Sequence, residues 1–233
     1  MSRRPTLAIV AICAAAGIPG GTAGAQFRLT LPTGAASVVM ARADHRVDAG
    51  NGVERTTGPL FGAQLDLDPA DRISVSLRAL GGTLDVADDT PGAEPRAIGE
   101  IALTTRFDVL PWLRGTAAAV GRSYDGALAR QHWTELSVGG EGHVPLIDGL
   151  VDATIGLSLA PVVKVTDRAG PDLAVAGVAR LRHSGERLDL SIGYSLQRYD
   201  FPATGGVRRL EEISMLVFRA GLRIGARRST TPR

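Results

Sequence analysis

An alternation of apolar and polar residues with a period of two runs through most of this chain and constrains its fold more than any other feature. Successive side chains of a β-strand point to opposite faces, so this spacing predicts strands with one apolar and one polar face. The clearest segment spans residues 187–197, where every second residue is large and apolar: Leu188, Leu190, Ile192, Tyr194 and Leu196. Similar segments, some weaker, cover residues 36–47, 60–68, 72–84, 99–109, 112–124, 133–146, 151–165, 172–183 and 216–225.

These segments predict about ten strands, many of them longer than the five or six residues typical of a soluble sheet. Around Ile213 to Val217 the alternation blurs, which we interpret as a β-bulge. Short links alternate with longer polar ones along the chain. Tight turns are expected at 69–71, 110–111, 148–149 and 184–186, and longer links at 48–55, 86–96, 125–132, 167–170 and 202–208. In an up-and-down arrangement this order puts the tight turns at one end and the longer loops at the other.

The first 25 residues have the three parts of a secretory signal peptide. Arg3 and Arg4 form a positive start, residues 7–16 are an apolar run too short to cross a bilayer, and Ala23-Gly24-Ala25 matches a small-residue cleavage pattern. We expect cleavage before Gln26. The one cysteine, Cys13, lies in this leader, so the mature chain is expected to have no disulfide and no thiolate site.

Charge excludes a nucleic-acid partner. The chain has 26 basic and 24 acidic residues, a formal net charge of +2, and the charges are scattered with no basic stripe. After the leader, no apolar run reaches the length of a transmembrane helix.

The signal peptide, the even strand number, the alternation and the closing segment 218–224 resemble a small bacterial outer-membrane β-barrel over residues 35–226. The resemblance implies an all-β fold: a closed, up-and-down, antiparallel transmembrane barrel of about ten strands, within a range of eight to twelve, with short periplasmic turns and longer external loops. It divides the chain into a signal peptide (1–25), a short N-terminal extension (26–35), the barrel (36–226) and a C-terminal tail (227–233). Such proteins commonly end in an aromatic residue, whereas this chain continues to Arg233.

In a membrane the apolar face of a closed sheet contacts lipid and the polar face lines a narrow, side-chain-filled lumen. Aromatic residues near the strand ends are then expected to form two interfacial girdles, with Phe107 and Trp112 at one rim and Phe61, Tyr124, Trp133, Tyr199 and Phe201 at the other. The lumen-lining polar network expected from the alternation consists of Glu100, Arg106, Arg114, Arg122, Glu135, Glu141, His143, Asp152, Lys164, Arg180, Asp189, Arg219 and Arg223.

A soluble secreted or periplasmic barrel, with its apolar face inward around an apolar ligand, is the main alternative. Two features favour the membrane barrel. The polar faces are rich in small residues rather than in Lys and Glu, and Lys164 is the one lysine of the chain. The apolar faces also contain few large rings for filling a core.

Catalytic and metal-binding signals are sparse. His143, Glu141 and Ser137 share a face of one strand and form the one candidate acid–base cluster, which keeps a membrane-barrel hydrolase as a further alternative. Asp66, Asp68 and Asp71 flank a turn but lack the spacing of a calcium loop, so we assign them to turn chemistry. No histidine has a partner at metal-ligand spacing.

The sequence therefore predicts a cell-envelope protein of the outer membrane that is not an enzyme and needs no cofactor or metal. Its expected role is structural, adhesive or that of a narrow path for a small solute or ion through the polar lumen. The expected partners are outer-membrane lipid and, during biogenesis, the envelope's barrel-assembly machinery.

Overall fold

A computed structural model describes residues 33–50, 52–87, 94–125, 130–147, 150–166 and 168–225. The expected signal peptide, nearly all of the N-terminal extension, the C-terminal tail and the turn at Asp148-Gly149 lie outside the described residues. Among the described residues, no helix has the length and apolar character needed to cross a membrane.

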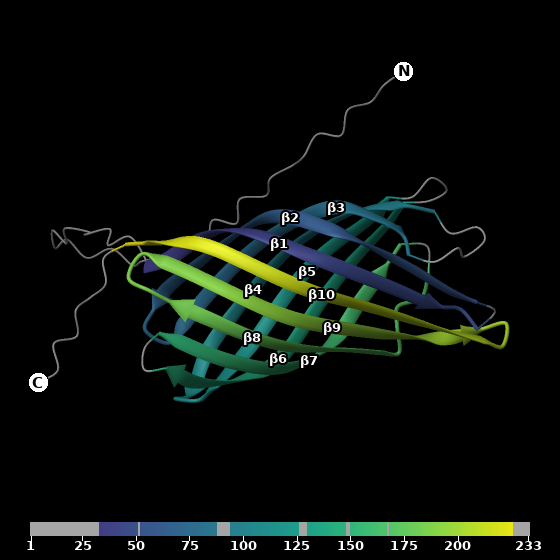
Figure 1. Cartoon of the computed structure of the whole chain (residues 1–233). Helices are drawn as coiled ribbons and strands as arrows, with labels where there is room; N and C mark the ends of the chain where they lie inside the picture. Colours follow the sequence, from purple (N-terminus) through teal and green to yellow (C-terminus); the bar gives the residue numbers. More distant parts are fainter. Residues whose placement is uncertain are drawn as a thin grey trace, which may run out of the picture. The chain divides into compact units, whose positions relative to one another are not determined.

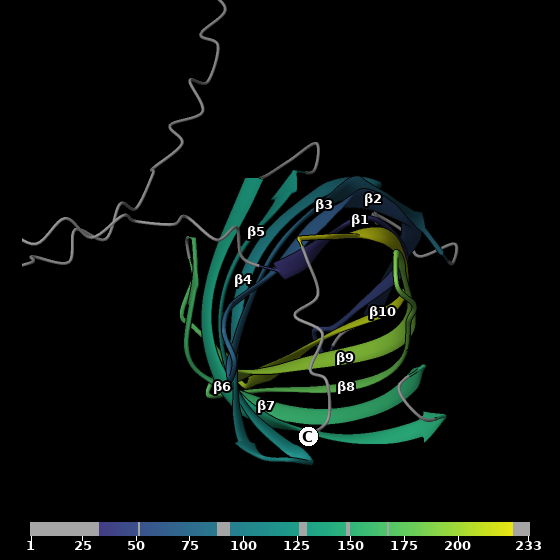
Figure 2. The ribbon, with the colours of Figure 1, turned by 90° about the vertical axis from the view of Figure 1, so that its left-hand side faces the viewer.

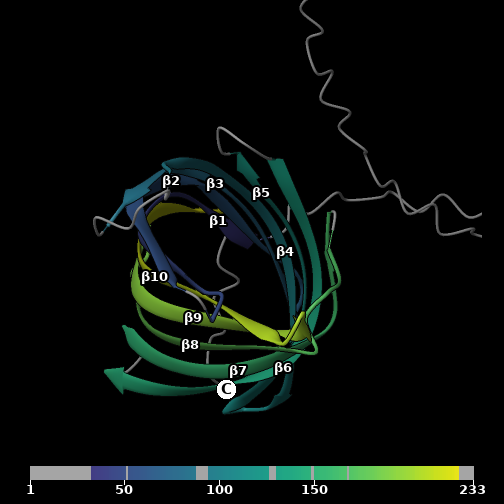
Figure 3. The same cartoon turned by 90° about the vertical axis from the view of Figure 1, so that its right-hand side faces the viewer.

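Ten antiparallel strands form one closed barrel, as Figures 2 and 3 show from its two ends. Each strand pairs with its neighbours in sequence, and β1 pairs with β10 to close the ring. The prediction of a closed up-and-down barrel is confirmed. The strands are β1 (Thr33–Asp48), β2 (Val53–Ala70), β3 (Ile73–Val86), β4 (Arg96–Leu110), β5 (Leu113–Asp125), β6 (Arg130–Ile147), β7 (Val151–Val165), β8 (Leu173–Ser184), β9 (Leu188–Thr204) and β10 (Val207–Ile224).

The barrel begins slightly earlier than the sequence indicates. β1 starts at Thr33, three residues before the boundary expected at 36, because Gly34 and Ala35 pair with both β10 and β2. Neither residue carries an apolar side chain large enough to signal a strand. Their inclusion follows from the length of β10, whose Ile224 lies opposite Gly34.

Tight turns at 71–72, 111–112 and 185–187 share one end of the barrel, and at the other end β1, β3, β5 and β7 finish beside the starts of β2, β4, β6 and β8. The expected polar link at 202–208 is wrong, because β9 continues to Thr204 and β10 starts at Val207. Gly205 and Gly206 alone connect them, with φ of 63° and 83°, the two positive values that a type I′ hairpin turn requires. Figure 1 shows this hairpin projecting at the long-loop end.

The outer face carries an apolar belt next to the tight-turn end. Here every second residue points outward and is apolar or glycine, apart from Thr105; Leu157, for example, is 75% exposed and Val38 69%. In β2, β4, β9 and β10 the belt is nine residues long, close to the 9–11 that a tilted strand needs to cross a bilayer. The belt comprises residues 34–40, 61–69, 73–79, 101–109, 113–119, 136–146, 151–162, 173–181, 188–196 and 216–224.

Beyond the belt, toward the long loops, the outward-pointing residues become polar and the inward-pointing residues become apolar. We call this the exchange of faces. On β1, Val38 and Met40 point outward within the belt, and the next outward residues are Arg42, Asp44 and Arg46. The inward residues of this part are apolar, and they form a buried cluster inside the barrel. Its members are Val39, Ala41, Ala43, Leu60, Leu80, Leu84, Ile98, Tyr124, Trp133, Val165, Ala174, Tyr199, Phe201, Ile213 and Met215.

This exchange corrects two expectations. The β9–β10 and β1–β10 registers run without a shift through residues 213–217, so the blurred alternation there marks the exchange of faces rather than a bulge. Likewise, the predicted outer girdle is wrong for four of its aromatic residues: Tyr124, Trp133, Tyr199 and Phe201 point into the barrel. The remaining three, Phe61, Phe107 and Trp112, are exposed on the outside, as expected.

Candidate functional site in the lumen

The lumen holds two polar networks, and we name the first, beside the aromatic cluster, the central network. Arg122 on β5 donates to Oε2 of Glu100 on β4 through Nε (3.0 Å) and Nη2 (2.6 Å), and Arg78 on β3 donates to the other oxygen at 2.7 Å. Arg122 also donates to Oε1 of Gln197 on β9 at 2.7 Å, and Tyr199 donates to Glu135 on β6 at 2.6 Å. These buried carboxylates are thus held by charge-assisted or hydroxyl donors from three strands, β3, β5 and β9.

The second network, which we name the lower network, lies toward the tight-turn end. Asp66 accepts hydrogen bonds from Gln64 (2.7 Å), Ser76 and Arg219. Arg219 also donates a 2.7 Å hydrogen bond to Asp189, which is fully buried. Arg182 donates to the same carboxylate at 2.9 Å. The result is a chain of donors and acceptors across β2, β3, β10, β9 and β8, in which each buried acid has at least one arginine partner.

Arg106 links this network to the opposite wall. Its Nε donates to Glu141 on β6 at 3.1 Å, and its Nη1 donates to Ser76 at 2.9 Å. The pair is nearly enclosed, with 14% of the Arg106 side chain and 9% of the Glu141 side chain exposed.

Above the central network the lumen is filled by rings, which we call the aromatic plug: His45, Tyr124, Trp133, Tyr199 and Phe201. His45 stacks on Tyr124 with centroids 5.1 Å apart, and Trp133 makes edge contacts with Tyr124, Tyr199 and Phe201 at 6.0, 5.1 and 5.8 Å. All five side chains are buried. Such edge-to-face packing fixes the rings relative to one another, and the five buried side chains occupy the lumen at this level.

A buried ion cluster covers the plug on the long-loop side. Glu211, 1% exposed, contacts Nε2 of His45 at 3.2 Å and Nε of Arg209 at 2.6 Å. Both His45 and Glu211 lie beyond the apolar belt. Burial lowers the pKa of His45 below its usual 6.5, against the opposing effect of Glu211. Burial alone would raise the pKa of Glu211, but the hydrogen bond from His45 and the charge of Arg209 hold it below its usual value.

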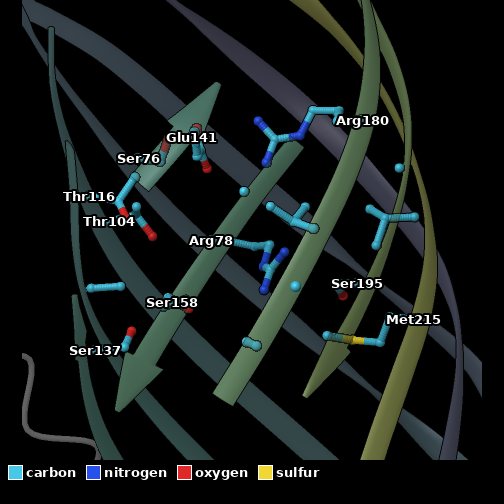
Figure 4. Close-up of a pocket in the computed structure, with 18 of the residues that line it drawn as sticks. Ser76, Arg78, Thr104, Thr116, Ser137, Glu141, Ser158, Arg180, Ser195 and Met215 are labelled. Atoms are coloured by element: carbon cyan, nitrogen blue, oxygen red, sulfur yellow. The ribbon is translucent and has the colours of Figure 1, made fainter. Parts of the chain in front are cut away.

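Between the plug and the lower network the lumen encloses a cavity of about 200 Å³. Hydroxyl groups of Ser76, Thr104, Thr116, Ser137 and Ser158 lie around it, as Figure 4 shows. Its charged lining residues are four arginines and a single glutamate: Arg78, Arg106, Arg180, Arg219 and Glu141. The charged part of the cavity wall is therefore biased toward positive charge, and the rest of the wall mixes hydroxyl groups with small and apolar side chains.

Twelve of the thirteen side chains expected to line the lumen point inward. Seven contact other charged groups in the two networks or in the Arg114–Asp108 pair: Glu100, Arg106, Arg114, Arg122, Glu141, Asp189 and Arg219. Glu135 is held by Tyr199, while His143, Asp152, Arg180 and Arg223 are half-buried on the same inner face.

Lys164 is the exception, and its expected placement in the lumen is wrong. It is exposed on the outside of β7, while its neighbour Val165 is buried in the apolar cluster. The register between β6 and β7 shifts between Val138↔Leu159 and Leu136↔Val162, so one strand carries an extra residue there. This bulge, together with the exchange of faces beyond the belt, turns the lysine outward.

Sequence reasoning missed several lumen residues. Asp66 is an acceptor at the centre of the lower network, not a turn residue. Arg78 and Arg182 occupy inward positions of β3 and β8 that the strand spacing around them already indicated. His45 and Glu211 gave no such signal, because their contact joins residues 166 positions apart in the chain.

The candidate acid–base cluster is not assembled as a relay. Glu141 is engaged by Arg106, and Nδ1 of His143 is buried without a hydrogen-bond partner among the residues that the structure describes. Ser137 lines the cavity. Within the same described ranges, no group of three or more His, Cys, Asp or Glu side chains is arranged to hold a metal ion.

The fold and lumen define a closed, ten-stranded, side-chain-filled barrel with an apolar outer belt. Solved structures similar to it include the outer membrane protease OmpT from Escherichia coli (9% identity; 82% of this chain and 96% of that chain covered; TM-score 0.48). An outer membrane channel from Pseudomonas putida is also similar (11% identity; 83% of this chain and 97% of that chain covered; TM-score 0.47). So is Neisserial surface protein A (10% identity; 81% of this chain and 97% of that chain covered; TM-score 0.37). The sequence matches no protein-family model and no curated protein.

Proposed function

We propose that this chain is an outer-membrane β-barrel protein with a structural or adhesive role, that it is not an enzyme, and that its lumen does not let solutes pass from one side of the membrane to the other. The observation that carries the membrane assignment is the belt. Large apolar side chains such as Ile155, Leu157 and Leu222 are 64–75% exposed around a barrel whose charged groups at that level point inward. A soluble protein rarely exposes so continuous an apolar surface, whereas lipid covers it at no cost.

The belt also sets the orientation of the proposed barrel in the outer membrane. It lies at the tight-turn end, and outer-membrane barrels have short turns on the periplasmic side and longer loops outside. The polar-faced part of the barrel, with Arg42, Asp44 and Lys164 on its surface, then projects beyond the outer leaflet. This projecting part is the surface available for a structural or adhesive contact.

The closed lumen favours this role over a solute path. A path would have to pass both the aromatic plug and the central network, where Trp133 is 3% exposed, Tyr199 1% and Arg122 4%. The alternative of a soluble barrel with an apolar ligand inside is disfavoured because the cavity wall carries four arginines and a glutamate, which an apolar molecule would leave without water. The hydrolase alternative is disfavoured because Glu141 is paired with Arg106 rather than with His143.

Cell fractionation combined with gel mobility tests the proposal. We expect the full-length protein to sediment with the outer membrane, to resist extraction by alkaline carbonate, and to migrate differently in a detergent gel before and after boiling. Reconstituted in planar bilayers, it should show no stable conductance steps. Recovery in the soluble fraction, or steady single-channel conductance, would contradict the membrane and the closed-lumen parts of the proposal, respectively.

A further inference from the structure

One arginine in the lumen has no carboxylate partner of its own, and the nearby charge of Glu141 is already engaged by Arg106. Arg180 on β8 is half-buried and lines the cavity, and it forms no hydrogen bond or ion pair with any residue that the structure describes. A charge that is partly withdrawn from water is unfavourable unless a counter-ion or water compensates it, and charges inside proteins are paired as a rule. The cavity side of Arg180 is therefore where a compensating group is needed.

The other charges around the cavity do not supply it. Arg78 pairs with Glu100, which Arg122 shares, and Arg219 pairs with Asp66 and with Asp189, which Arg182 shares. These three carboxylates are not among the residues that line the cavity. The one acid on the wall, Glu141, is engaged by Arg106. Each of these carboxylates is already engaged by at least one other arginine, and Figure 4 shows the Arg180 side chain reaching into the cavity on the side of Glu141.

The remaining wall suits an oxyanion. Hydroxyl groups from Thr104, Thr116, Ser137 and Ser158 face the same space from four strands, and each can donate one hydrogen bond. A guanidinium binds two oxygens of a carboxylate or phosphate group with its planar fork. The cavity of about 200 Å³ is several times the roughly 30 Å³ that one water molecule occupies, so a small anion fits with a few waters.

We propose that the lumen cavity is a binding site for a compact oxyanion, held by the fork of Arg180 and by the hydroxyl-lined wall opposite it. Because the aromatic plug closes the long-loop side, the anion reaches the site from the tight-turn side. The bound anion completes the charge balance of the lumen, so the site does not require a conducting path.

Inorganic phosphate is the probe for the first test. The purified, detergent-solubilised full chain is titrated with phosphate by calorimetry, and its thermal unfolding is followed at increasing phosphate against chloride of the same ionic strength. We expect saturable binding and a rise in the unfolding temperature with phosphate but not with chloride. Parallel titrations with sulfate and acetate distinguish a tetrahedral oxyanion from a carboxylate.

Arg180→Gln should weaken phosphate binding at least tenfold and abolish the thermal shift. Without phosphate it should unfold no earlier than the wild type, because it removes an unpaired charge. Arg180→Lys, which keeps the charge but not the fork, should bind with intermediate affinity. Arg114→Gln is the matched control, because Arg114 also points inward but pairs with Asp108 and does not line the cavity. Wild-type affinity in Arg180→Gln, or equal effects of phosphate and chloride on the wild type, would overturn the proposal.

Discussion

The hydroxyl of Tyr199 on β9 donates a 2.6 Å hydrogen bond across the lumen to Oε2 of Glu135 on β6. Two strands, β7 and β8, separate these residues along the wall, so the bond ties together two strands that do not pair with each other. Tyr199 also packs its ring on Trp133. The same side chain therefore belongs to the aromatic plug and to the central network, and it couples the apolar part of the lumen to the polar part.

Removing this hydroxyl should destabilise the barrel. Tyr199→Phe keeps the ring but leaves the buried Glu135 without its donor, so we expect a loss of about 1–3 kcal/mol in the free energy of unfolding. Urea unfolding of the detergent-refolded protein measures it. Tyr194→Phe is the control, because Tyr194 is 49% exposed on the belt, and this change should have little effect. Equal stabilities of the two variants would show that the Glu135 contact contributes nothing.

A charge on the belt should prevent stable assembly. Leu157 is 75% exposed near the middle of the belt on β7, and an arginine there faces hydrocarbon at a cost of about 2–4 kcal/mol. We expect Leu157→Arg to lower the amount of heat-modifiable protein in the outer membrane. Thr134→Arg introduces the same charge on the exposed outer face beyond the belt, opposite Lys164, and should assemble normally. Normal assembly of Leu157→Arg would place that face away from lipid.

The plug should control passage through the barrel. Trp133 contacts three other rings, so Trp133→Ala leaves a hole in the cross-section as well as a loss of packing of about 3–5 kcal/mol. In bilayers we expect conductance events that the wild type lacks. The matched variant is Trp112→Ala, whose ring is 58% exposed on the outside, and it should stay silent. A silent, folded Trp133→Ala protein would show that another element closes the lumen.

Acidification should weaken the part of the barrel beyond the belt. His45 has a pKa below 6.5 in the folded state because it is buried, so the unfolded chain binds a proton first, and stability falls as the pH drops below 6.5. The lowered pKa of Glu211 acts in the same direction, but only below about its usual 4.5.

The His45 effect can be separated by substitution. His45→Gln keeps a donor for Glu211 but does not titrate, so its urea midpoint should change less between pH 7.5 and 5.5 than that of the wild type. His132→Gln, at an exposed site, controls for loss of a histidine and should retain the wild-type pH dependence. If His45→Gln shows the wild-type dependence, the titrating group lies elsewhere.

How far the fold could be predicted depends on what alternation encodes. The period of two identifies strands such as 188–196 without help from the rest of the chain, and ten such strands joined by alternating short and long links leave an up-and-down barrel as the natural arrangement. Alternation also groups residues by face. It does not say which face is inside or where a bulge shifts the alternation, and Lys164 shows the consequence, since the extra residue of β7 turns it outward beyond the belt.

The same argument applies to the aromatic residues. Trp133 and Leu136 lie three residues apart on β6, yet Leu136 points to the belt and Trp133 to the plug. Beyond the belt the barrel is built like a soluble one, apolar inside and charged outside, so the soluble alternative describes the packing of this part. The cavity and the unpaired Arg180 were beyond prediction, because partners and gaps depend on side chains from six or more strands meeting in space.

The most direct measurement of the central claim, that the belt faces lipid, uses tryptophan fluorescence. In a Trp112→Phe/Trp133→Phe background, Leu157→Trp puts the one tryptophan on the belt and Thr134→Trp puts it on the outer face beyond the belt. In bilayers of lipid brominated along its acyl chains, we expect strong quenching for the tryptophan at position 157 and weak quenching at position 134. Weak quenching at 157, or equal quenching at both positions, would contradict a membrane-spanning belt.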